Sequence, residues 1–61
     1  MDTYTIEELL EARRSIASTK NKCEKALLKL RPGKSQHTLT ARRIAAFEVA
    51  LDLIERELND M

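Results

Sequence analysis

The sequence predicts an all-α protein, a two-helix antiparallel hairpin, and three observations support this fold class. The 61 residues include one Gly and one Pro, adjacent near the middle of the chain, so the strongest helix breakers occur at one place. The only aromatic residues are Tyr4 and Phe47, a composition that favours helices over strands. Apolar residues recur at helical spacing on both sides of the break. We therefore expect one helical-hairpin domain over residues 1–61.

The first helix is expected over residues 6–30. Thr5 and Glu8 have the spacing of a capping box, in which each side chain accepts a hydrogen bond from the other residue's backbone amide. Pro32 disfavours a helical conformation at Arg31, and Gly33 tolerates a turn. The helix should therefore end close to residue 30.

The second helix is expected over residues 36–59, after a turn over residues 31–35. Ser35 is the best candidate for its N-cap, because a serine hydroxyl accepts from the first backbone amides of a helix. A connection this short makes the two helices antiparallel neighbours.

Seven-residue repeats of apolar side chains predict how the helices pack. In the first helix, Leu9, Ile16 and Cys23 are each followed three residues later by a small residue (Ala12, Thr19 and Ala26), which favours close packing. The second helix is apolar over roughly half its circumference, which is more than one helix pair covers. We therefore expect two hairpins to dimerise into a four-helix bundle. The residues expected in the core and at the self-association surface are Leu9, Ile16, Leu27, Ile44, Phe47, Leu51, Ile54 and Leu58.

Two alternatives to the homodimer are a complex with another helical protein and a monomer with an exposed apolar side. Large exposed apolar patches usually mark an interface, so the sequence favours association over the monomer.

Charge is strongly segregated along the chain, although the net charge is only +1. The segment 20–43 carries eight basic residues and one acid, whereas the remainder carries nine acids and three bases. In a hairpin, the turn end is then positive and the end with both termini is negative. One interpretation is a dimer of oppositely directed hairpins, and the other is a basic tip that binds nucleic acid or another anion. Candidate anion-binding residues are Lys29, Arg31, Lys34, Arg42 and Arg43.

No set of residues predicts catalysis, so we expect a protein that is not an enzyme and has no cofactor and no metal. Cys23 and His37 are the only residues of their kinds, and the two do not make a zinc site. Cys23 falls on the apolar stripe, where a cysteine acts as a small hydrophobe. The acids at helical spacing, such as Glu48 and Asp52, are expected to form a solvated face, since the Glu-x-x-His motif of bundle metal sites is absent.

The sequence gives no indication of a membrane partner. No apolar run approaches the ~20 residues of a membrane span. The N-terminus lacks the apolar core of a secretion signal, and a lone cysteine suits a reducing compartment, so we expect a cytoplasmic location. The size would suit a small bacterial or phage protein.

Two families have a similar architecture. The length, the short turn and the heptad stripes resemble Rop, the small plasmid protein whose hairpins dimerise into a four-helix bundle and bind paired RNA. The segments CEKALLKL (23–30) and QHTLTARRIAAFEVALDLI (36–54) resemble the helices of the small hairpin chaperones of type III secretion. The first resemblance implies a homodimer, and the second implies a complex in which a partner helix covers the apolar side.

Overall fold

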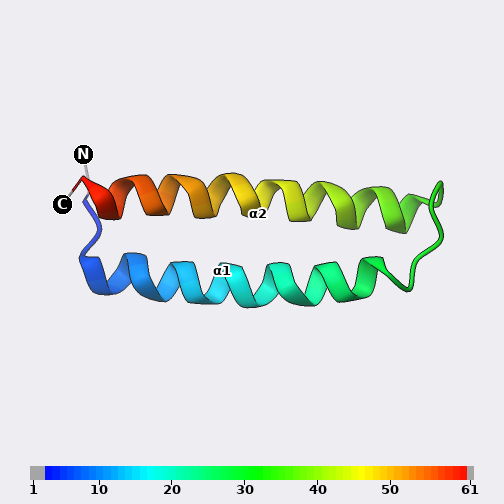
Figure 1. Cartoon of the computed structure of the whole chain (residues 1–61), viewed down its shortest axis with the longest axis horizontal. Helices are drawn as coiled ribbons and strands as arrows, with labels where there is room; N and C mark the ends of the chain where they lie inside the picture. Colours follow the sequence, from blue (N-terminus) through cyan, green and yellow to red (C-terminus); the bar gives the residue numbers. More distant parts are fainter. Residues whose placement is uncertain (1–2, 61) are drawn as a thin grey trace.

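The computed structural model describes residues 3–60 and contains two α-helices joined by a turn (Figure 1). Helix α1 spans Ile6–Leu27 and α2 spans Ser35–Asn59. The helices run antiparallel, side by side, in a rod with extents of 42 × 18 × 17 Å. Both termini lie at one end and the turn lies at the other (Figure 1). The predicted all-α hairpin is confirmed.

Helix α1 begins at the predicted residue because its capping box is formed. The Glu8 backbone amide donates to Thr5 Oγ1 at 3.0 Å, and the Thr5 amide donates to Glu8 Oε1 at 2.9 Å. Without the capping box, these two backbone amides would have to donate to water. Glu7 and Glu8 also place negative charge where the helix macrodipole favours it.

Helix α1 ends at Leu27, three residues before the predicted end. The Lys29 amide donates to the Ala26 carbonyl at 3.0 Å, and the Leu30 amide donates to the Leu27 carbonyl at 3.1 Å. These bonds span three residues instead of four, so the chain tightens into a 3₁₀-like turn. The helix therefore ends before Arg31, the residue whose conformation Pro32 restricts.

Helix α2 ends at Asn59 as predicted, but Ser35 is its first residue and not its N-cap. Lys34 occupies the cap position in an extended conformation, and its side chain makes no capping hydrogen bond. Gly33 precedes it with a φ of +89°, a left-handed conformation that glycine adopts at little cost. The α2 N-terminus is therefore uncapped by any side chain.

A single hairpin buries little of its surface. Among residues 3–60, the only residues that are more than nine-tenths buried are Leu9 and Thr40, which are 6% and 8% exposed. The chain exposes 5113 Å², whereas a compact protein of 7.0 kDa exposes roughly 4,000 Å². Most of the apolar stripe is therefore only half covered within one chain.

Candidate interaction surface

The helices meet along a seam whose α2 positions alternate by three and four residues, the spacing of coiled-coil packing. The structure places all eight residues of the predicted apolar set on this seam. Leu9 is buried and the other seven are half-buried. The α2 seam consists of His37, Thr40, Ile44, Phe47, Leu51, Ile54 and Leu58, and the α1 side of Leu9, Arg13, Ile16, Lys20, Cys23 and Leu27, with Leu30 in the turn beyond.

The predicted pattern of small residues in the α1 seam is wrong in part. Thr19 and Ala26 are exposed, whereas Lys20 and Leu27 are half-buried in their place. The step from Ile16 to the next seam position is four residues instead of three. The small residues therefore lie beside the seam, where they leave space along one edge of it.

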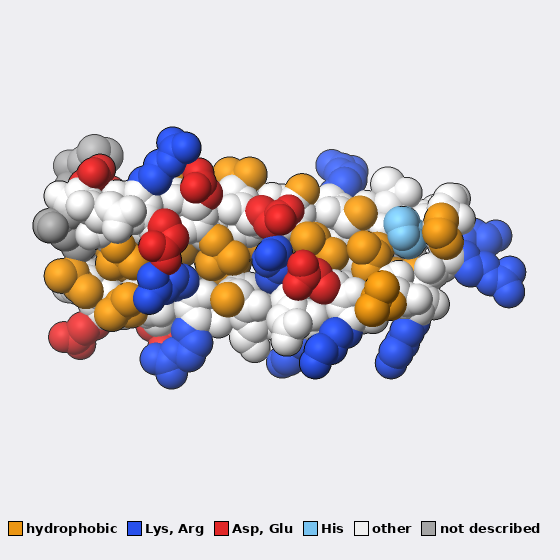
Figure 2. All heavy atoms as spheres, viewed as in Figure 1, with side chains coloured by type: hydrophobic (Ala, Val, Ile, Leu, Met, Phe, Trp, Pro, Cys, Tyr) orange, Lys and Arg blue, Asp and Glu red, His pale blue; other side chains and the backbone are white. Residues whose placement is uncertain are grey.

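Two interhelical ion pairs lie along one edge of the seam. Arg13 pairs with Glu55, and Lys20 Nζ lies 3.9 Å from Glu48 Oε2 and 3.7 Å from Glu24 Oε2. Figure 2 shows this edge, where acidic and basic side chains meet across the apolar seam. From Arg13 to Lys20 the chain advances seven residues along α1, and the paired acids move back by seven residues along α2. Both pairs therefore have the same antiparallel register.

These ion pairs were not among the features predicted from the sequence, although a signal for them was present. Two bases seven residues apart on α1 face two acids seven residues apart on α2. Exposed pairs of this kind contribute little to stability, but they cover the apolar seam from one side. A second copy or another partner has better access from the other side.

We call the opposite edge of the seam the open face. Glu48 and Glu55 directly follow seam residues of α2, so the residues that directly precede seam residues lie on the other side, because each residue advances the helix by about 100°. On α1 the open face carries mostly small side chains, and on α2 it is apolar apart from Gln36 and two charges. It consists of Glu8, Ala12, Ser15, Thr19, Lys22 and Ala26 of α1, and Gln36, Leu39, Arg43, Ala46, Ala50, Leu53 and Glu57 of α2.

Within residues 3–60, no ion pair bridges the two helices across the open face. Leu39 and Leu53 are 39% and 57% exposed on it. The wide apolar arc of the second helix therefore corresponds to two surfaces, one against α1 and one that a single chain leaves in water.

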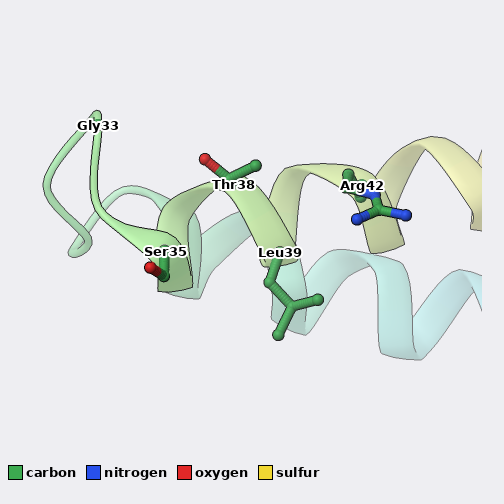
Figure 3. A pocket seen from close by; sticks show the side chains of 5 residues that line it. All are labelled: Gly33, Ser35, Thr38, Leu39 and Arg42. Atoms are coloured by element: carbon green, nitrogen blue, oxygen red, sulfur yellow. The ribbon is translucent and has the colours of Figure 1, made fainter.

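The turn end is basic, but it does not gather its charges into one site. An open hollow of about 430 Å³ is lined by Gly33, Ser35, Thr38, Leu39 and Arg42 (Figure 3). Of the five candidate anion-binding residues, only Arg42 lines this hollow. All five are exposed, and none has an ion-pair partner among the described residues: Lys29, Arg31, Lys34, Arg42 and Arg43.

Cys23 and His37 both lie on the seam and are half-buried there. Cys23 occupies the middle of the α1 side between Lys20 and Leu27. His37 lies in the first turn of α2, at the end of the seam nearest the turn. Neither side chain takes part in a hydrogen bond within residues 3–60.

No family model matches this chain, and no curated protein or solved structure shows significant similarity to it. The structure has the two-helix architecture on which both resemblances rested, and none of these comparisons supports either family. Neither helix, as described, is long and apolar enough to cross a membrane.

Proposed function

We propose that this chain is a non-enzymatic interaction module that self-associates through its open face into a four-helix bundle and acts in the cytoplasm through the surfaces of that dimer. The observation that carries the proposal is the poor burial of a single hairpin. Its seam is half-covered, and its open face presents apolar side chains to water next to that seam.

The areas support a dimer of this kind. Two separate hairpins expose about 10,200 Å². A compact protein of twice the mass exposes roughly 6,700 Å², so association would bury on the order of 3,500 Å². That value lies within the range of obligate homodimers, about 2,000–5,000 Å².

The two edges of the seam also support association on one side only. On the ion-pair edge, Arg13 and Lys20 bring charge over the seam, and covering these groups would cost desolvation. On the open face, the small side chains of Ala12, Thr19 and Ala26 let another helix approach closely.

The mass in solution tests this proposal. Light scattering behind size exclusion, run over a series of protein concentrations, is expected to give twice the 7.0 kDa chain mass. A mass of one chain throughout the micromolar range, together with a cooperative thermal melt, would refute self-association. The search would then turn to a different helical protein as the partner, which is the role that a hairpin chaperone has.

A second candidate function is binding of nucleic acid by the turn end. The observation that favours it is the uncapped N-terminus of α2, whose free backbone amides lie among exposed basic side chains such as Lys34 and Arg42. Binding to RNA or duplex DNA should then fall steeply with salt. Replacing Lys29, Arg31 and Lys34 together by Gln should abolish it, and the absence of any gel shift at low salt would exclude this function.

A further inference from the structure

We propose that the second copy docks on the open face in the antiparallel direction, with the twofold axis beside Ala50 and with Arg43 of each copy paired to Glu57 of the other. This inference rests on the self-association proposed above. It goes further by fixing the direction of the partner and the residues that select it.

The first argument is the spacing of three residues. Arg43, Ala50 and Glu57 are seven residues apart, and each directly precedes a seam residue, so all three lie on the open face of α2. At 1.5 Å per residue, Arg43 and Glu57 each lie about 10.5 Å from Ala50, in opposite directions along the helix. A twofold axis beside Ala50 therefore brings Arg43 level with the partner's Glu57, and it does so twice.

The second argument is that these two charges have no role within one chain. Both side chains are exposed, and neither has an ion-pair partner among residues 3–60. Glu57 also lies in the last turn of α2, where the helix macrodipole disfavours a negative charge. A partner outside the chain would give both charges a favourable interaction.

The third argument comes from the apolar residues around Ala50. The same axis places Leu53 level with the partner's Phe47, and Ala46 level with the partner's Ile54. Leu53 is 57% exposed in the single chain, and it would be covered in this arrangement. Ala50 has a small side chain, so the two α2 helices can approach closely where they cross the axis.

The parallel dimer lacks these matches. When the open faces pack with both turns at one end, α2 of each copy faces α1 of the other, so Arg43 lies toward Lys22 of the partner subunit and Glu57 toward the partner's Glu8, and like charges across an interface select against that arrangement. Helix α1 has the same polarity on the open face, with Glu8 near the termini and Lys22 nearer the turn. Both helices therefore favour the antiparallel dimer.

Charge reversal tests the pairing. The dissociation constant is expected to rise on the order of tenfold for R43E and for E57R, because two weak pairs become two repulsions. The double variant R43E/E57R should return to within about threefold of the natural chain. E57R puts a base in the last turn of α2, where the macrodipole favours it, and R43E replaces an exposed side chain that has no ion-pair partner among residues 3–60, so a loss of helix would not explain weaker association.

R14E is the matched control, because it makes the same charge change at an exposed residue of α1 that directly follows the seam residue Arg13 and so lies on the ion-pair side, away from the open face. It should leave the dissociation constant within about threefold of the natural value. In a parallel dimer, R43E would bring a glutamate toward Lys22 of the partner subunit and would not weaken association. A dissociation constant for R43E that equals or falls below those of R14E and the natural chain would therefore overturn the pairing.

A distance measurement tests the direction independently. A spin label at K34C, in a C23A background, lies 16 residues from Ala50 along the register of α2. Dipolar spectroscopy should give a distance of roughly 50 Å in the antiparallel dimer and below about 20 Å in a parallel one. A short distance would overturn this inference alone, whereas a monomer by mass would refute the proposed self-association itself.

Discussion

The replacement of Ala46 by Glu is the most direct test of the open face, and Ala45 supplies its control. Both alanines are exposed in the single hairpin and are adjacent in the middle of α2. Ala46 directly precedes the seam residue Phe47 and lies on the open face, whereas Ala45 is turned about 100° away toward the ion-pair edge. A46E and A45E should therefore be equally tolerated by a monomer.

The dimer distinguishes the two variants. An unpaired buried charge costs about 3–5 kcal/mol, and a carboxylate at the border of the interface should cost roughly 2 kcal/mol in each copy. Two copies then lose about 4 kcal/mol of association free energy, which raises the dissociation constant roughly a thousandfold. For A45E we expect a change of less than about threefold, because a surface substitution away from the interface changes little.

The assay is sedimentation equilibrium for the dissociation constant, with far-ultraviolet circular dichroism to verify that both variants remain helical. A46E should sediment as a monomer at concentrations where A45E and the natural chain are dimers. If the two variants associate equally well, the open face is not the interface, and the asymmetry of the two seam edges has no part in association.

Three further predictions concern stability and need only thermal or denaturant melts. F47A should lower the free energy of unfolding by about 3–5 kcal/mol, because the dimer completes the burial of a ring that one chain half covers; a loss below about 1 kcal/mol would place Phe47 outside any core. T5A should cost about 0.5–2 kcal/mol, because it removes the acceptor of the Glu8 amide, and an unchanged melt would mean that the capping box contributes nothing in solution. K34D should raise the midpoint by roughly 4–8 °C, because Lys34 already has the extended conformation of an N-cap and Asp supplies the missing acceptor; a lower midpoint would contradict this reading of the turn.

The beginning of α1 and the end of α2 were predictable, whereas the residues around the turn were not. Thr5 and Glu8 form a local motif that needs no tertiary information, and the structure contains both of its hydrogen bonds. The last turn of α1 tightens before Pro32, and Lys34 takes the cap position that Ser35 was expected to hold. Both outcomes depend on how the chain reverses direction at Gly33, which no pattern of side chains determines in advance.

The sequence predicts the position of each seam residue of α1 to within one residue. Heptad spacing from Leu9 and Ile16 leaves two possible positions for the next residue of the seam, Thr19 and Lys20. Composition favours the threonine, but the structure places Lys20 there, with its ammonium group 3.9 Å from Glu48 at the edge of the seam. If Lys20 is the seam residue, Thr19 and the other small residues lie on the open side of the seam. The position of the open face therefore depends on whether Thr19 or Lys20 occupies the seam.

The position of the two termini, at the same end of a 42 Å rod, has a consequence for anything joined to this chain. Cargo attached before residue 3 and cargo attached after residue 60 leave from the same end, so neither lies beside the turn. In an antiparallel pair, the attachment points of the two copies are at opposite ends. A fused hairpin would then serve as a rigid spacer that holds two identical cargoes apart by about the length of the bundle.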